Sequence, residues 1–229
     1  MGILWDAVVK ALHLIVSLDP EVVDTTWRSL RISVASTLLA ALICIPLGGI
    51  IAFRSFRGKR LLITIIQTFY STPTVCVGVL VLIFVSHAGP LGGLDLVYTP
   101  TAMVIGQMLL ITPVLLGMTI SALTSVDKTI KDTTLSLGAS EFQAIWAIIK
   151  EARFAIIAAL LLGFGRAISE VGAAMIIGGN IWRYTRVLTT AISLAAQQGD
   201  FALALALGII LIGVAMIVSL AANMVQQRR

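Results

Sequence analysis

The sequence predicts an all-α polytopic membrane protein whose chain crosses the bilayer about five times. Of its 229 residues, 59% are hydrophobic and only 12% are charged, whereas a soluble domain carries about 25% charged residues. Four uncharged runs, and a fifth that contains one arginine and one glutamate, each reach the length of about 20 residues that crosses a hydrocarbon core of about 30 Å. The predicted spans are Ile32 to Phe53, Leu61 to Val85, Thr101 to Leu123, Phe154 to Gly179 and Phe201 to Val225.

Residues 1–20 precede the first span and favour a helix that lies in the membrane interface. Asp6, Lys10, His13 and Ser17 recur at spacings of four and three residues. This spacing places them in one polar stripe on a helix whose other face is apolar. A short extra span is the alternative. A signal peptide is disfavoured because the segment does not begin with a basic region.

Basic residues divide unequally between the two sides of such a bundle. The loops after the first and third spans and the C-terminus carry ten: Arg54, Arg57, Lys59, Arg60, Lys128, Lys131, Lys150, Arg153, Arg228 and Arg229. The opposite side carries five: Lys10, Arg28, Arg31, Arg183 and Arg186. The positive-inside rule therefore predicts a cytoplasmic C-terminus and an N-terminus outside. The net charge of +5 is not gathered into a basic patch with interleaved aromatics, so nucleic acid is not an expected partner.

Most of the loops between the spans are short, which predicts one bundle and one domain over residues 1–229. Pro46, Pro73 and Pro113 fall inside three separate spans, where each proline removes a backbone hydrogen bond and bends the helix. Cys44 and Cys76 also fall inside spans and give no disulfide or metal framework.

The loop at residues 127–153 is the one long charged interruption and has the pattern of two short helices. Gly138 suits the left-handed cap that ends the first helix. Ser140 with Gln143 has the spacing of a capping box that starts the second. Two apolar faces follow at helical spacing: Val126, Ile130, Thr134 and Leu137, then Phe142, Ile145, Trp146 and Ile149. Such a segment either lies on the membrane surface or enters the groove of a partner protein.

Within this loop the run Asp132-Thr133-Thr134-Leu135-Ser136-Leu137-Gly138-Ala139-Ser140, with Ile148 further on, resembles the EAA motif of permease subunits of ATP-binding-cassette importers. The Leu-Gly-Ala-Ser core and its spacing match. Asp-Thr-Thr replaces Glu-Ala-Ala, and Lys150 and Glu151 replace Leu-Pro. The resemblance implies coupling helices that dock into clefts on ATPase subunits. The implied contact residues are Asp132, Thr133, Thr134, Leu137, Gly138, Ala139, Ser140 and Phe142.

A second resemblance concerns the cargo. Three further runs are similar to permeases for tetrahedral oxyanions, and most similar to the tungstate type: Arg166 to Ala173, Gly178-Gly179-Asn180, and Tyr184 to Ile192. The resemblance implies a type I importer permease in a prokaryotic inner membrane that works as a homodimer. It also implies an external oxyanion-binding protein facing the loop at residues 179–200. ATP and Mg²⁺ would be held by the ATPase subunits, and this chain would need no cofactor.

Arg166 and Glu170 are the ionisable residues within the fourth span, where charge is costly unless it is paired or hydrated. Their spacing of four residues allows a salt bridge on one helical face. Either this pair fixes the helix to its neighbours, or the two residues line or gate the transport route. Further candidates for the pathway or gate are Gly172, Asn180, Arg186 and Thr189.

Two alternative functions remain open, one with another cargo and one with another source of energy. The same machinery could carry molybdate or sulfate, or the chain could be a proton-coupled secondary transporter in which Glu170 relays protons. Covalent catalysis is not expected, because His13 and His87 lie in separate segments and no Ser-His-Asp set can be assembled. Gly58-Lys59 lacks the rest of a phosphate-binding loop, so the chain is not expected to hydrolyse ATP.

Overall fold

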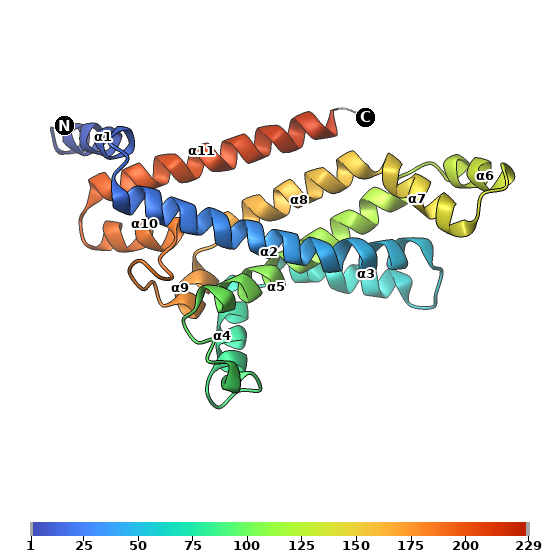
Figure 1. Ribbon diagram of the computed structural model, residues 1–229, viewed down its shortest axis with the longest axis horizontal. Coiled ribbons are helices and arrows are strands. Elements are labelled where there is room, and N and C mark those ends of the chain that lie inside the picture. The colour runs from blue at the N-terminus through green and yellow to red at the C-terminus, as the bar shows by residue number, and fades with distance from the viewer. Residues whose placement is uncertain (1, 228–229) are drawn as a thin grey trace.

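The computed structural model describes the backbone of residues 2–227 and the side chains in that range except those of residues 2–4, 128 and 131. Within that range every regular element is a helix (Figure 1). The α-helices are α1 (Gly2–Val16), α2 (Pro20–Phe53), α3 (Lys59–Thr68), α4 (Thr74–Val85), α5 (Pro100–Thr124), α6 (Lys128–Ser136), α7 (Glu141–Glu151), α8 (Arg153–Ile168), α9 (Gly172–Gly178), α10 (Leu188–Gln197) and α11 (Phe201–Gln226). Two short 3₁₀ turns, η1 (Phe69–Ser71) and η2 (Gly92–Leu94), complete them.

The predicted spans appear as three unbroken helices and two bent pairs. In the described part of the chain, α2, α5 and α11 are each long and apolar enough to cross a membrane. The pair α3–α4, with η1 between, bends by 98°, and the pair α8–α9 bends by 61°. Counting each pair as one span gives the five that the sequence predicts. Proline accounts for the first break because Pro73 cannot donate a backbone hydrogen bond.

The first span begins earlier than predicted. Asp19 caps α2 by accepting hydrogen bonds from the backbone N–H groups of Glu21 and Val22 at 2.9 and 3.3 Å. Pro20 occupies the first helical position, where its missing N–H costs nothing. The helix therefore extends 12 residues beyond the predicted start at Ile32. Its 34 residues make it about 51 Å long at about 1.5 Å per residue, longer than the hydrocarbon core.

The first and third spans pack side by side and run in the same direction. Ser36 on α2 donates to the side chain of Gln107 on α5 at 2.9 Å, and Cys44 further along α2 donates to the carbonyl of Thr112 at 3.6 Å. Both contacts join residues in the same order along the two helices. Around them lies a core cluster of fully or nearly fully buried residues: Ala40, Cys44, Ile111, Leu115, Ala159 and Ala167.

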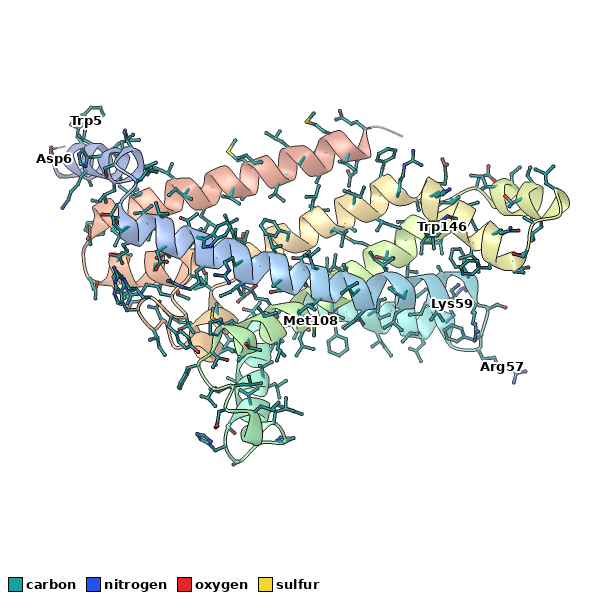
Figure 2. The ribbon with its side chains drawn as sticks, in the orientation of Figure 1. Trp5, Asp6, Arg57, Lys59, Met108 and Trp146 are labelled. Atoms are coloured by element: carbon teal, nitrogen blue, oxygen red, sulfur yellow. The ribbon has the colours of Figure 1, made fainter. Side chains whose placement is uncertain are left out.

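Loops that the charge pattern assigns to one side do lie at one end of the bundle. Arg57 and Lys59 lie at the same end as Trp146 on α7, whereas Trp5 and Asp6 lie at the far end (Figure 2). Helices α2, α5 and α11 run toward the first of these ends, and α3 and α8 run back, whereas α4 turns away from the bundle (Figure 1). The relative topology thus follows the predicted alternation of spans. Which end faces the cytoplasm stays a prediction from the charge count.

The N-terminal segment is a helix that packs against α11. Ala11 is fully buried in this contact, and Asp6, Lys10 and His13 are exposed, as the predicted polar stripe requires. Its placement in the membrane interface stays a prediction.

The segment at residues 179–200 is only partly the loop that the sequence predicted. Irregular chain ends at Val187, and α10 then packs against α11 and α2. Leu188, Thr190 and Ala191 of α10 are buried. The loop prediction is therefore wrong for Leu188–Gln197, because tertiary packing buries a segment whose composition, rich in threonine and alanine, gives no clear helical pattern.

Candidate functional site

The loop at residues 127–153, called the coupling loop below after the role that the resemblance implies, folds as two helices joined by a glycine corner. Asp127 starts α6 by accepting from the backbone N–H and hydroxyl of Thr129 at 2.9 and 2.7 Å. These two hydrogen bonds lower the pKa of the Asp127 carboxyl. At the other end, the N–H groups of Gly138 and Ala139 donate to the carbonyls of Leu135 and Thr134. This paired pattern ends a helix and requires a left-handed residue at its corner.

Gly138 supplies that left-handed residue, with a φ of 86°. A Cβ atom added to it would meet nothing within 4 Å, so backbone conformation alone makes glycine necessary here. The capping box follows as predicted. The backbone N–H of Gln143 donates to Ser140 Oγ at 3.3 Å, and Gln143 Oε1 accepts from the backbone N–H of Ser140 at 2.8 Å.

The second helix of the loop presents apolar side chains on two sides. Ala144 and Ile148 are buried, and Ile148 packs in one core cluster with Leu123. Phe142 and Trp146 point away from it and are 78% and 53% exposed. The predicted face that included Ile145 and Ile149 is thus only partly right, because those two residues are half-buried.

Leu137, at the corner, is 83% exposed. Together with Phe142 and Trp146 it forms what we call the apolar ridge of the coupling loop. The remaining predicted contact residues surround this ridge. Asp132, Thr133 and Ser140 are exposed, and Thr134 and Ala139 are half-buried.

The second feature is the break between α8 and α9, residues 169–171. Glu170 is 8% exposed, and its Oε1 accepts from the backbone N–H of Ala173 at 2.9 Å. Its own carbonyl accepts from the hydroxyl of Thr189 on α10 at 2.7 Å. The carboxylate therefore serves as a cap for α9, satisfying a backbone donor that the break exposes.

The expected salt bridge between Arg166 and Glu170 is not formed. The spacing argument assumed a continuous helix, but α8 ends at Ile168, and Glu170 turns toward α9 instead. Among the described residues, Arg166 has no acidic partner within 4.0 Å. The hypothesis of a self-neutralising pair is wrong for this structure.

Gln107 and Ser36 form hydrogen bonds beside the break, and the sequence analysis missed both residues. The side-chain amide of Gln107 donates to the carbonyl of Ala167, in the last turn of α8, at 3.1 Å. Ser36 donates to Gln107 from the other side. An uncharged amide midway along the apolar run at residues 101–123 was the available signal, because a buried amide in a membrane needs partners.

The breaks in the two bent spans lie against each other. A Cβ atom at Gly172 would lie 2.9 Å from Val75 Cγ2 and 3.0 Å from Thr74 Oγ1, at the start of α4. Glycine at this position therefore permits the close approach of α9 to α4. Non-helical backbone inside a membrane protein is tolerated where it is buried or lines a cavity.

Arg166 lines a cavity of about 160 Å³ beside these breaks. Its other walls are almost entirely apolar and come from η1, α4 and α5: Phe69, Val77, Leu80, Leu109, Leu110 and Pro113, with Thr72 adding one hydroxyl.

A larger cavity of about 610 Å³, which we call the vestibule, lies between α3, α5, α8 and α11. Its polar lining is uncharged: Gln67, Tyr70, Ser121, Ser125 and Gln226.

Asn180 and Arg186 lie in the loop that follows α9. Asn180 has a φ of 52°, and its buried Oδ1 has no hydrogen-bond partner among the described residues. Arg186 lies 3.5 Å from Glu21 and stacks over the ring of Trp182, with its guanidinium carbon 4.8 Å from the ring centre. Thr185, which sequence reasoning missed, is fully buried and ties this loop to the carbonyl of Gly178.

Of the predicted pathway residues, the structure brings Glu170, Gly172 and Thr189 together at the break. It places Arg166 in the adjoining cavity and assigns Asn180 and Arg186 to the loop beyond. Among the described residues no group of three or more His, Cys, Asp or Glu side chains could hold a metal ion. Broken apolar spans around a vestibule with a neutral polar lining are features of a membrane transport protein.

The chain belongs to the family of binding-protein-dependent transport system inner membrane components, which matches residues 44–229. It is thus the permease component of an ATP-binding-cassette importer. Its fold agrees with this assignment. The permease in an inward-facing structure of the MetNI methionine ABC transporter superposes with a TM-score of 0.70 at 16% identity, over 90% of this chain and 95% of that chain.

Three relatives have a higher sequence identity to this chain than the methionine transporter chain has. The tungstate uptake system permease protein TupB of Peptoclostridium acidaminophilum is 43% identical over 88% of this chain and 89% of its own. A probable anion ABC transporter permease of Haloferax volcanii is 40% identical over 83% and 84%. The protein named TupB in Campylobacter jejuni is 35% identical over 93% and 89%. Permeases named for molybdate/tungstate and for sulfate match at 29% and 25% identity.

Proposed function

We propose that this chain is the permease through which an ATP-driven importer carries tungstate into the cell. The observation that carries the proposal is the similarity to two tungstate uptake permeases, at 43% and 35% identity over nearly the whole chain. Molybdate and sulfate are the alternative cargoes, because permeases named for them match at lower identity.

The energy would come from partner subunits that bind the coupling loop. Leu137, Phe142 and Trp146 expose most of their apolar surface, and large apolar side chains that fill a partner's pocket contribute most of the affinity at such interfaces. ATP and Mg²⁺ would be held by the ATPase subunits, with no nucleotide site or cofactor in this chain.

The route for the anion would pass the Arg166 cavity and leave through the vestibule. Among the described residues, no carboxylate lies within 4.0 Å of the Arg166 guanidinium. This cation would attract a dianion, and more strongly where the neighbouring apolar walls exclude water. Neutral hydroxyl and amide groups in the vestibule can donate hydrogen bonds without holding the ion tightly. Gly172, Glu170 and Thr189 would position the break that opens and closes this route.

A second copy of the chain would complete the pathway. Helix α4 has 12 residues and is about 18 Å long, too short to span a bilayer alone. Its outer face exposes Val75, Val79, Leu80, Ile83 and Phe84. Covering that face with the α4 of a second copy would enclose the Arg166 cavity between two half-pores.

The external binding protein would dock above Asn180 and Arg186, with the N-terminus outside and the C-terminus in the cytoplasm.

The cargo assignment is tested by reconstituting the permease in proteoliposomes with its ATPase and binding protein. ATP hydrolysis should be stimulated most by tungstate when tungstate, molybdate and sulfate are compared at equal concentration. Equal stimulation by the three anions contradicts the tungstate assignment.

The rival class, a proton-coupled secondary transporter, is tested in the same vesicles. Dissipating the proton gradient while ATP is held constant should leave uptake unchanged. A collapse of uptake under those conditions contradicts the ATP-driven mechanism.

A further inference from the structure

A basic groove lies between α2, the start of α5 and the loop at residues 179–187, away from the cavities described above. It encloses about 550 Å³ and is open on one side. Three guanidinium groups line it, from Arg28, Arg31 and Arg183, against one carboxylate, that of Asp24.

Among the residues that the structure describes, only one of the three arginines forms an ion pair. Arg28 forms an ion pair with Asp24, and its other guanidinium nitrogen donates to the carbonyl of Arg186 at 2.7 Å. Arg31 and Arg183 have no acidic partner within 4.0 Å in the described part of the chain. The groove therefore presents two uncompensated positive charges. A guanidinium fork fits the oxygens of a phosphate group with two parallel hydrogen bonds.

The position of the groove along the spans places it at the membrane surface. The uncharged runs Ile32 to Phe53 and Thr101 to Leu123 both begin in the groove, since Ile32 and Thr101 are among its lining residues. Because the two helices run in parallel, both hydrocarbon boundaries fall at the same level. Lipid phosphate groups lie just outside that boundary.

The surface beneath the groove suits acyl chains. Val34, Leu38 and Leu42 follow Arg31 on one exposed face of α2 and are 44%, 59% and 71% exposed. Trp27, one turn on the other side of Arg31, is 60% exposed and lines the groove. An exposed tryptophan beside arginines at the end of an apolar stripe is typical of the headgroup level.

We propose that this groove binds the phosphate of an anionic phospholipid through Arg31 and Arg183, with the acyl chains lying along the face of α2 formed by Val34, Leu38 and Leu42. The bound lipid would link the first span to the loop that follows α9. The free cargo oxyanion is tetrahedral like the phosphate group, but it has no apolar part that could contact the exposed face of α2. The proposal concerns lipid binding and stands whichever anion is transported.

The test compares the purified full-length permease with the double variant Arg31→Gln/Arg183→Gln. The matched control is Arg57→Gln, an exposed arginine at the opposite end of the bundle. Each protein is titrated in neutral detergent with short-chain phosphatidylglycerol, phosphatidylcholine or sodium tungstate, and the melting temperature and bound lipid by native mass spectrometry are measured. Circular dichroism and size exclusion check that each variant is folded.

Phosphatidylglycerol should stabilise the wild type and the control more than phosphatidylcholine does. Its apparent affinity should fall about five-fold for each arginine removed, and the stabilisation should weaken with salt in the wild type, which keeps the proposal testable if the double variant does not fold. Equal retention of phosphatidylglycerol by the double variant overturns the proposal. So does stabilisation by tungstate alone that the double variant loses, which assigns the groove to the cargo.

Discussion

Gln107 on α5 donates a hydrogen bond to the carbonyl oxygen of Ala167 on α8, at 3.1 Å, where α8 is about to break. This hydrogen bond is buried. The same side chain accepts a hydrogen bond from Ser36 on α2. Gln107 therefore links α2, α5 and α8 at the point where the span formed by α8 and α9 bends.

Replacing Gln107 with leucine should lower stability by about 0.5 to 2 kcal/mol, the range measured for hydrogen bonds between membrane helices. The loss should appear as a lower midpoint of unfolding in a denaturing detergent titration. Gln198→Leu is the control, because Gln198 is exposed at the end of α10. Equal midpoints for the two variants contradict the role given to Gln107.

Two variants of Glu170 distinguish a capping role of this residue from a proton-relay role. Glu170→Gln keeps an oxygen that can accept from Ala173, so uptake should stay within about two-fold of wild type. Glu170→Ala removes the cap, at a cost of about 0.5 to 2 kcal/mol, and uptake should fall. The measurement is ATP-driven tungstate uptake at several pH values. Loss of uptake in Glu170→Gln equal to that in Glu170→Ala favours the proton relay.

Arg166→Gln should reduce uptake at least about ten-fold, because unit charges at 4 Å attract by about 1 to 4 kcal/mol between water and a protein-like surrounding. Basal ATP hydrolysis should be unchanged, since Arg166 lies outside the coupling loop. Arg166→Lys keeps the charge and should recover part of the uptake. A glutamine variant that imports at the wild-type rate excludes Arg166 from the route.

Gly138→Val should uncouple ATP hydrolysis from import while the spans remain inserted. A left-handed backbone costs a non-glycine residue about 1 to 2 kcal/mol, so the corner between α6 and α7 would shift. The matched control is Gly208→Ala within α11, where a Cβ atom would also meet nothing within 4 Å but the backbone is helical. Unaltered coupling in Gly138→Val counts against the docking role.

Phe142→Ala should weaken capture of the ATPase by about 2 kcal/mol or more, as expected when a central apolar contact is truncated. Co-purification of the ATPase with the permease, and its affinity by surface binding, measure the loss. Phe201→Ala is the control, because Phe201 is 56% exposed at the start of α11, away from the coupling loop. Similar affinities for the two variants would falsify the apolar ridge as a contact.

Sequence reasoning predicted the parts of the fold that depend on composition and local caps. The number of spans, the Gly138 corner and the Ser140 capping box all follow from patterns within about 25 residues. The break at residues 169–171 could not be predicted, because no proline marks it and its stability depends on Gln107 and Thr189 from other helices. For the same reason the spacing of Arg166 and Glu170 suggested a pair that the bent backbone does not allow.

The coupling loop connects two different kinds of span. It follows α5, which is unbroken, and leads directly into α8, whose 16 residues extend about 24 Å to the break. A displacement of α7 by a partner would therefore be transmitted along α8, because a continuous helix is stiff. The far end of α8 is the break at Glu170, so a displacement of α7 would change the angle between α8 and α9.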